Sequence, residues 1–253
     1  MKAKSFLGPL LLVLVAGCGQ KADDSKSASQ TATATKPKLT KLNVVVKKEG
    51  TGEPLKLDDQ VYMQYTGKLA DGTVFDSNDK EGGKPLAFPL GRGNVIKGWD
   101  EGVTGMKVGE EAEIQVPSDL GYGARGVGSI PPDSDLYFTV KVLDVIRAGE
   151  NNSKVTVTDL KEGTGPEVKA GSTVSIEYVG TYVSGRQFEK NKATFTDGKG
   201  QVIPGIDLGI VGMKAGGKRR LRVFPGAGYA KGGPETVDGT QILIFEITVT
   251  SVK

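Results

Sequence analysis

The segment Val95-Ile96-Lys97-Gly98-Trp99-Asp100-Glu101-Gly102-Val103 decides the fold of this chain. Ile96, Trp99 and Val103 fall at positions i, i+3 and i+7, so the spacing predicts a short helix with these three side chains on one face. Trp99 is the only tryptophan of the sequence. A helix of about two turns is not stable by itself in water, so neighbouring segments must cover its apolar face.

Alternating apolar and polar residues on both sides of this helix predict β-strands. The alternation occurs in 61–65, 111–116 and 136–142, and in the first of these it places Tyr62 on the opposite face from its neighbours. Asp71-Gly72 predicts a tight hairpin turn. Strands dominate and the one helix is short, so the sequence predicts an α+β domain in which an antiparallel sheet curves around the helix.

The sequence contains two copies of this domain. Lys48-Glu49-Gly50-Thr51-Gly52 recurs 113 residues later as Lys161-Glu162-Gly163-Thr164-Gly165, and later motifs recur with a shift of 107 residues. A period of this length is that of a whole domain rather than of a solenoid repeat. We therefore expect one domain at 41–148 and a second at 153–253, joined by a short polar linker.

The composition excludes several classes of function. A formal net charge of +3 over 253 residues gives no argument for nucleic acid as a partner. The sequence has no histidine, which removes Ser-His and Cys-His nucleophile pairs and the commonest metal ligand. We therefore expect neither covalent nor metal catalysis and no cofactor.

We expect the first forty residues to lie outside both domains. Residues 1–17 combine lysines, a short apolar run and small residues, which is typical of an export signal. The segment resembles a bacterial lipoprotein signal in which Cys18, the only cysteine, is lipidated; the alternative is an ordinary signal peptide with an incidental cysteine. Residues 18–40 are rich in Ser, Thr, Ala and Lys and predict a flexible tether. These features imply an exported, membrane-anchored protein, on an outer membrane facing the periplasm or the surface if the cell is Gram-negative.

Several side chains of the first copy stand at positions that the periodic pattern does not require. Tyr122 and Ile130 lie in a glycine-rich loop, and Phe75 and Asp76 follow the hairpin. A carboxylate and a hydroxyl among apolar side chains are typical of a pocket for a small, mostly apolar ligand.

Five motifs of the first copy, in this order and spacing, resemble those of the FK506-binding-protein (FKBP) type of peptidyl-prolyl cis-trans isomerase. The motifs are Tyr65-Thr66-Gly67, Val74-Phe75-Asp76-Ser77, Val95-Ile96-Lys97-Gly98-Trp99, Gly121-Tyr122-Gly123 and Ile130-Pro131-Pro132. The resemblance covers about residues 43–147. It implies two FKBP-like domains, the second of them degenerate.

The resemblance also implies a set of site residues. Trp99 would form the floor beneath a proline ring, the hydroxyl of Tyr122 and the backbone N–H of Ile96 would donate to substrate carbonyls, and Asp76 would lie near the rotating amide. The catalytic positions implied are Asp76, Tyr122, Trp99, Phe75 and Ile96, and the substrate-binding positions are Tyr65, Leu86, Val95, Ile130 and Phe138.

The first copy departs from the family pattern at three places on the rim of this pocket. Leu86 stands where an aromatic residue is common, Asn94 stands where Glu is common, and the loop 125–129 is one residue short. We expect these departures to change ligand affinity and sequence preference more than activity. The expected partners are proline-containing unfolded or exported polypeptides, with FK506- or rapamycin-type macrolides as inhibitors.

Isomerisation of an X-Pro bond needs no nucleophile. The barrier of roughly 20 kcal/mol comes from amide resonance, and a dry apolar pocket disfavours the polar planar amide relative to the twisted one. One hypothesis is therefore a tethered isomerase that accelerates the folding of exported proteins. The alternative is a non-enzymatic chaperone or partner-binding lipoprotein that uses the same fold.

The second copy keeps the apolar pattern of the helix but changes the pocket. We expect its fold to survive and isomerase activity to reside in the first copy. In the second copy, Glu189 replaces Asp76, Ile206 replaces Trp99, Ala193 replaces Leu86, Val237-Asp238-Gly239 replaces Ile130-Pro131-Pro132, and six residues before Phe195 are missing.

One cluster of basic residues stands out in the second copy, comprising Lys218, Arg219, Arg220 and Arg222. One interpretation is the solvated face of a strand whose inward residues are Leu221 and Val223. The alternative is a patch that faces anionic lipid or an acidic partner.

Overall fold

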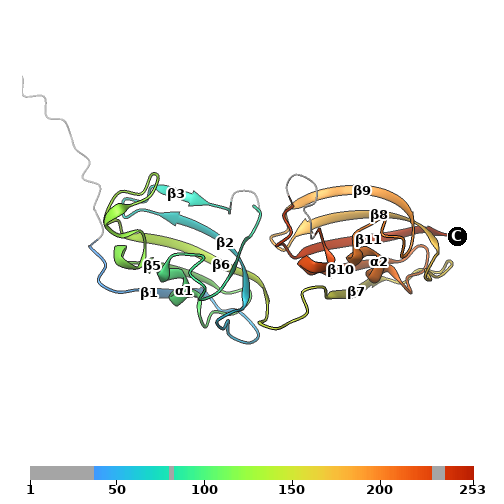
Figure 1. Cartoon of the computed structure of the whole chain (residues 1–253), viewed down its shortest axis with the longest axis horizontal. Helices are drawn as coiled ribbons and strands as arrows, with labels where there is room; N and C mark the ends of the chain where they lie inside the picture. Colours follow the sequence, from blue (N-terminus) through green and yellow to red (C-terminus); the bar gives the residue numbers. More distant parts are fainter. Residues whose placement is uncertain (1–36, 80–82, 230–236) are drawn as a thin grey trace, which may run out of the picture. The chain divides into compact units, whose positions relative to one another are not determined.

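The computed structural model describes residues 37–79, 83–229 and 237–253, which form two domains (Figure 1). Each domain is a curved antiparallel sheet with one short α-helix, which confirms the predicted α+β fold. The signal peptide predicted at 1–17 and the lipidation predicted at Cys18 lie outside the described residues. Within those residues, no helix is both long enough and apolar enough to cross a membrane.

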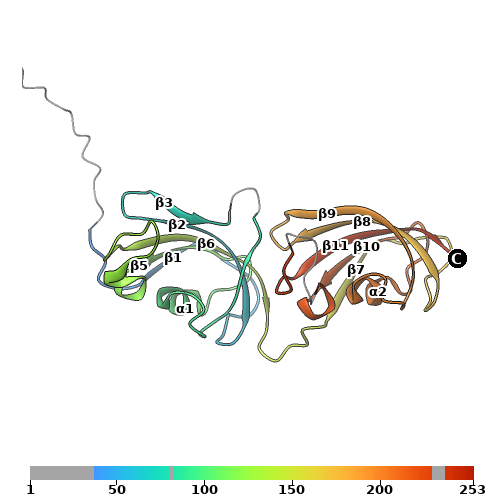
Figure 2. The ribbon, with the colours of Figure 1, turned by 45° about the horizontal axis from the view of Figure 1, so that its top comes forward.

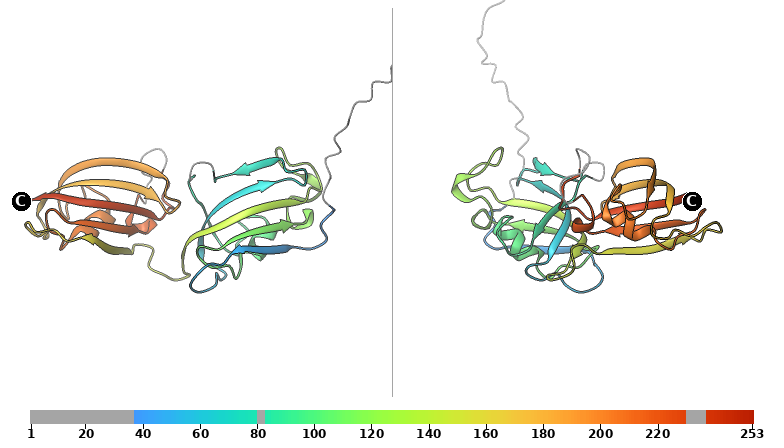
Figure 3. Two further views of the ribbon diagram at one scale, coloured as in Figure 1. Left: turned by 180° about the vertical axis from the view of Figure 1, so that it is seen from behind. Right: turned by 45° about the vertical axis from the view of Figure 1, so that its right-hand side comes forward.

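The first domain contains six strands, one α-helix and two 3₁₀ helices. They are β1 (Asn43–Lys48), β2 (Gln60–Lys68), β3 (Val74–Ser77), β4 (Leu86–Pro89), α1 (Lys97–Val103), β5 (Glu111–Val116), η1 (Ser118–Leu120), η2 (Gly123–Arg125) and β6 (Leu136–Ile146). The strand order is β1-β5-β6-β2-β3, and β4 also pairs with β2. All of these pairs are antiparallel, and Figure 3 shows the strands from behind.

The short helix α1 lies against the concave face of this sheet (Figure 2). It begins at Lys97 rather than at Val95, because Ile96 is extended, with φ −61° and ψ 150°. The carbonyl of Ile96 accepts the N–H groups of Trp99 (2.9 Å) and Asp100 (3.3 Å). Ile96 therefore caps the helix and keeps its own N–H outside the helical hydrogen-bond pattern.

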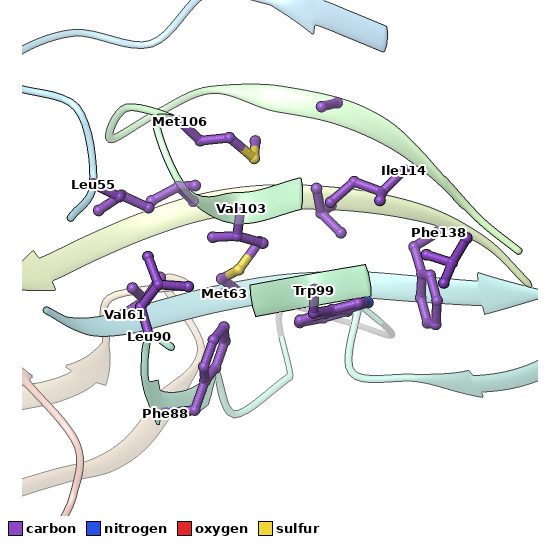
Figure 4. Close-up of a cluster of buried hydrophobic side chains, with 14 of the residues drawn as sticks. Leu55, Val61, Met63, Phe88, Leu90, Trp99, Val103, Met106, Ile114 and Phe138 are labelled. Carbon is purple, nitrogen blue, oxygen red and sulfur yellow. The ribbon is translucent and has the colours of Figure 1, made fainter. Parts of the chain in front are cut away.

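The core of the first domain forms where α1 meets the sheet (Figure 4). Trp99 and Val103 are 3% and 0% exposed, as the predicted apolar face requires. They pack in one cluster with Val61 and Met63 of β2 and Phe138 of β6. Burial of these side chains supplies the stability that a seven-residue helix lacks by itself.

The predicted hairpin is confirmed between β2 and β3. Gly72 has φ +90°, a value that glycine adopts without steric cost. The side chain of Asp71 accepts the N–H of Thr73 at 2.9 Å, and Leu69 N–H donates to the carbonyl of Thr73 at 2.9 Å.

Tyr62 differs from what the period of two suggests. The alternation places it on the outer face of β2, yet it is fully buried. Its ring belongs to a small second cluster with Ile146, Phe224 and Ile242, and its hydroxyl donates to the carbonyl of Thr240 at 2.8 Å. Alternation along one strand identifies two faces but does not show that both are covered.

Over its described residues, 153–229 and 237–253, the second domain repeats the plan of the first with one strand fewer. Its elements are β7 (Val155–Lys161), β8 (Thr173–Tyr182), β9 (Gln187–Thr196), α2 (Pro204–Ile210), β10 (Lys218–Val223), η3 (Pro225–Ala227) and β11 (Leu243–Val252), and the strand order is β7-β10-β11-β8-β9. Pro204 stands in the first turn of α2, where its missing N–H costs no hydrogen bond. Ile206 and Ile210 occupy the positions of Trp99 and Val103 and are buried.

The missing strand has a direct cause in the sequence. In the first domain, β2 pairs with β3 at Thr66–Lys68 and with β4 at Gln60–Met63, and residues 78–85 separate the two partners in the sequence. In the second domain, the single strand β9 pairs with β8 along Thr173 to Thr181, on the side where β2 of the first domain has two partners. The six residues that the second copy lacks before Phe195 fall in the stretch that separates β3 from β4, so one long strand, β9, takes the place of two short ones.

The four residues of the basic cluster on β10 each face a carboxylate. The pairs are Lys218 with Glu246 (2.6 Å), Arg219 with Asp159 (2.6 Å), Arg220 with Glu246 (2.6 Å) and Arg222 with Asp144 (2.7 Å). Leu221, which lies between Arg220 and Arg222, and Val223, which follows Arg222, are fully buried. The pairing favours the interpretation as one face of a strand over that of a free basic patch.

Candidate active site

A cavity of about 180 Å³ opens on the concave side of the first domain. It lies between the β2–β3 hairpin, β4, the start of α1 and the loop that precedes β6. Its lining residues are Tyr65, Phe75, Asp76, Leu86, Asn94, Val95, Ile96, Trp99, Tyr122 and Phe138. Apolar and aromatic side chains with a few polar tips make this a site for a small, largely apolar group.

The floor of the cavity is the indole of Trp99. Its ring meets those of Tyr65 and Phe138 edge-on, with centroids 5.1 Å and 5.3 Å away, and it tilts against Phe88 at 5.8 Å; Figure 4 shows it between the two phenylalanines. Edge-to-face pairs of this kind add stability beyond their buried area. The Trp99 Nε1 is buried and has no hydrogen-bond partner within the described part of the chain.

Two phenylalanine rings form a wall of the cavity above this floor. Phe75 and Phe138 meet at 5.7 Å with their planes perpendicular. They can lie so close to β2 because residue 67 is glycine: a Cβ there would lie 2.5 Å from the Phe75 ring and 2.9 Å from the Phe138 ring. The Tyr-Thr-Gly motif therefore provides both a tyrosine of the pocket and the space that its phenylalanines need.

The polar groups of the cavity meet at Asp76. The hydroxyl of Tyr65 donates to Asp76 Oδ2 at 2.5 Å, and the N–H of Ser77 donates to Oδ1 at 2.9 Å. Burial and the hydrogen bond to Asp76 raise the pKa of Tyr65 well above its ordinary value. Tyr65 is therefore a neutral donor at physiological pH, and its hydroxyl is already in use.

Two further donors of the cavity remain available. Tyr122 is 39% exposed, and burial of its ring followed by the charge of Asp76 raises the pKa of its hydroxyl. Neither this hydroxyl nor the backbone N–H of Ile96 makes a hydrogen bond to any residue in the described ranges. The pocket thus offers two free donors beside an apolar floor, which suits a ligand that combines an apolar ring with carbonyl groups.

The structure brings together nine of the ten site residues predicted in the first domain. The exception is Ile130, which does not line the cavity. It is 6% exposed and packs in the core cluster that includes Trp99 and Phe138. Asn94 also lines the cavity. The sequence places it on the rim of the pocket as a departure from the family pattern, but it is not among the ten predicted site residues.

The family model described as "FKBP-type peptidyl-prolyl cis-trans isomerase" matches residues 51–143 and 165–250, which is more than half of the chain. The chain belongs to the FKBP family. The two matched segments fall one in each domain, so both domains are FKBP domains.

Curated relatives support the same assignment. FK506-binding protein 4 of Neurospora crassa is 52% identical over 99 residues, covering 39% of this chain and 21% of that protein. FK506-binding protein 2 of Yarrowia lipolytica is 46% identical over 124 residues, covering 47% of this chain and 85% of that protein. The bovine peptidyl-prolyl cis-trans isomerase FKBP10 is 34% identical over 202 residues, covering 76% of this chain and 34% of that protein. Its match extends over both FKBP domains, whereas the other two have the length of one.

Among solved structures, that of AtFKBP13 is 36% identical and covers 42% of this chain and 93% of its own, with a TM-score of 0.39. These relatives bear on the FKBP domains alone and do not address the predicted lipoprotein signal.

The second FKBP domain places a different carboxylate at the site of Asp76. Glu189 Oε1 accepts the hydroxyl of Tyr178 at 2.8 Å, and Oε2 accepts the hydroxyl of Tyr229 at 3.3 Å. Burial and the neighbouring Glu189 raise the pKa of Tyr229 to about 12. The carboxylate of Glu189 therefore accepts both tyrosine hydroxyls, whereas in the first FKBP domain no described residue bonds the hydroxyl of Tyr122.

Proposed function

We propose that this protein is a peptidyl-prolyl cis-trans isomerase whose active site is the cavity of the first FKBP domain. The observation that supports the proposal most directly is the apolar floor of Trp99 beside two donors that bond no residue in the described part of the chain, the hydroxyl of Tyr122 and the N–H of Ile96. An apolar floor of this kind suits a proline ring, and the donors suit the carbonyls on either side of it.

The reaction breaks and forms no covalent bond, so the site needs to stabilise only the twisted amide. In the planar amide, resonance places charge on the oxygen and nitrogen, and rotation reduces this polarity. A cavity with apolar walls favours the less polar twisted state. The donors at the rim hold the peptide on either side of the rotating bond, which leaves rotation as the remaining degree of freedom.

We assign the activity to the first domain because the second lacks two features of this site. Ile206 provides a smaller floor than Trp99, and Glu189 already binds the hydroxyls of Tyr178 and Tyr229. A substrate carbonyl would have to compete with a charged acceptor for Tyr229, and hydrogen bonds to charged groups are the stronger ones.

The substrates that we propose are X-Pro bonds of exported polypeptides. The support is the N-terminal pattern of 1–17 followed by Cys18, which is typical of a lipidated, exported protein. The names of the relatives support FK506-type macrolides as ligands of the same cavity. Because uncatalysed proline isomerisation takes tens of seconds, an isomerase outside the cytoplasm would shorten a slow folding step.

A second candidate function is a non-enzymatic chaperone or partner-binding role for the second domain. The observation that favours it is the retention of a complete core there, with Phe245, Ile206 and Ile210 buried, although its site is altered. A binding role needs the fold but not the free tyrosine hydroxyl.

The test is a prolyl isomerase assay on the full chain, with and without an FK506-type macrolide. Tyr122→Phe removes the free donor of the first domain, and Tyr229→Phe is the matched change in the second. We expect catalysis that the macrolide blocks, a loss of about tenfold in Tyr122→Phe, and an unchanged rate in Tyr229→Phe. Absence of catalysis in the unaltered chain would refute the enzymatic proposal and leave the binding role.

A further inference from the structure

The loop that bears Tyr122 is pinned at its base by one carboxylate. The loop runs from the end of β5 to the start of β6, over residues 117–135, and contains η1, η2 and Ile130. Its last residue is Asp135, which is 6% exposed. Asp135 Oδ1 accepts the N–H of Ser118, the second residue of the loop, at 3.1 Å. One side chain therefore joins the two ends of the loop.

The same carboxylate receives the segment that precedes β1. Asp135 Oδ1 accepts the ammonium of Lys38 at 2.8 Å, and Oδ2 accepts the backbone N–H of Leu39 at 2.6 Å. Lys38 and Asp135 are 97 positions apart in the sequence. Asp135 thus makes three bonds, two of which come from residues before the first strand.

Lys38 also contacts both ends of the loop directly. Its ammonium donates to the hydroxyl of Ser118 at 3.1 Å and to the carbonyl of Asp133 at 2.5 Å. With Asp135, this gives one ammonium three acceptors, which is the number of protons that it has to donate. We call Lys38, Leu39, Ser118 and Asp135 the loop clasp.

Hydrogen bonds within the loop connect its base to its tip, so a displacement of the base also displaces the tip. The N–H of Asp133 donates to the carbonyl of Gly123 at 2.9 Å, next to Tyr122. Val127 and Ile130 exchange both backbone hydrogen bonds, at 3.0 Å and 2.8 Å. Gly126 has φ +59°, and a Cβ there would lie 2.3 Å from the carbonyl oxygen of Ile130. Close packing of this kind moves as a unit rather than bending locally.

We propose that Lys38 and Leu39 are positioning residues for isomerisation: through Asp135 they fix the loop so that the Tyr122 hydroxyl stands at the pocket rim. The proposal rests on the proposed isomerase function for the role of Tyr122. It implies that the active unit of the first domain begins at or before Lys38, five residues ahead of β1. The segment that would link the domain to an anchor is then also part of the support of its active site.

The first test compares Lys38→Met with Lys38→Arg and a control in the full chain. Lys47→Met is the matched control, because Lys47 forms an exposed ion pair with Glu113 at 3.2 Å on β1. We expect kcat/KM to fall about fivefold in Lys38→Met, to return to within about twofold in Lys38→Arg and to stay unchanged in Lys47→Met. An unchanged kcat/KM in Lys38→Met would overturn the proposal.

The second test separates positioning from a general loss of stability. In a double-mutant cycle, Tyr122→Phe should cost less in the Lys38→Met background than in the unaltered chain, because a displaced hydroxyl no longer contributes fully. Strict additivity of the two changes would show that the loop clasp does not act through Tyr122, and would refute the proposal.

A third measurement does not depend on catalysis. Hydrogen exchange of the amides of Gly126, Ile130 and Asp133 should accelerate in Lys38→Met, while those of β2 and β6 should not. If the unaltered chain proves inactive, the proposed function fails but this measurement still decides whether the clasp holds the loop. Equal exchange in the two proteins would overturn the clasp itself.

Discussion

Gly67 offers the sharpest test of how the pocket is built. It lies directly opposite Asp76 on β3 and Phe138 on β6. In Gly67→Ala, the added methyl carbon would lie 2.5 Å from the Phe75 ring and 2.9 Å from the Phe138 ring. Both contacts are far shorter than the optimum of about 3.5–4.0 Å for two carbon atoms, so the walls of the cavity have to move.

The size of the effect follows from these distances. The Phe75 ring has to retreat by roughly 1 Å to restore a normal contact. Overpacking of a well-packed core costs about 2 kcal/mol of unfolding free energy. A displacement of about 1 Å in a group that shapes an active site can reduce the rate by up to about 100-fold. We therefore expect a modest loss of stability and a much larger loss of isomerase activity.

The second domain provides a matched control at Gly180, where a Cβ would lie 2.6 Å from the Phe188 ring and 3.1 Å from the Phe245 ring. Gly180→Ala should lower the stability of its own domain by a similar amount and leave the isomerase rate unchanged. Urea unfolding followed by Trp99 fluorescence reports on the first domain alone, because Trp99 is the only tryptophan. Activity within threefold of normal in Gly67→Ala, or an equal loss in Gly180→Ala, would contradict the reasoning.

Three further predictions concern stability and ligand binding. Burial alone would raise the pKa of Asp59, but hydrogen bonds from Lys56, Ala148 and Arg147 outweigh it and lower the pKa. The resulting stabilisation is present above about pH 4 and is lost as the pH falls through the folded-state pKa of Asp59. Asp59→Asn should therefore destabilise the first domain at pH 7 and make its stability depend less on pH in the acid range. An unchanged dependence of stability on pH would contradict this prediction. Trp99→Ile leaves a smaller floor and removes the ring against which Tyr65, Phe88 and Phe138 pack, so it should weaken macrolide binding at least tenfold in calorimetry. Retained affinity would exclude Trp99 as the floor. Glu189→Ala leaves two half-buried hydroxyls without an acceptor and should cost about 1–2 kcal/mol in the denaturant unfolding of the second domain, whereas no cost would show that water replaces the carboxylate.

The sequence predicted the fold because local signals agreed with one another. The spacing of Trp99 and Val103, the Asp71-Gly72 turn and the alternating strands all point to a curved sheet around one helix, and the structure confirms each of them. The pocket could be predicted for a related reason. Tyr65, Phe75 and Tyr122 occur in short motifs, and a motif with fixed spacing preserves the direction of its side chains.

What the sequence could not show depends on contacts between distant segments. Tyr62 is buried by Phe224 and Ile242, which lie more than 160 residues later. Lys38 contacts Asp135 from a segment whose composition predicts a flexible tether. No local pattern distinguishes a lysine that finds a buried carboxylate from one that stays in solvent, because their side chains have the same propensities and differ only in their partners.

The hydrogen bonds of Glu189 have a consequence for the number of ligand molecules that one chain would bind. In the second domain, the tyrosine hydroxyls must break their hydrogen bonds to Glu189 before either can donate to a ligand carbonyl. In the first domain, the hydroxyl of Tyr122 can donate to a carbonyl without first breaking a bond to any described residue. Two domains of one family in a single chain suggest two equivalents of ligand. The hydrogen bonds predict that a titration saturates at one molecule per chain, so the stoichiometry would reveal which domain retains an open site.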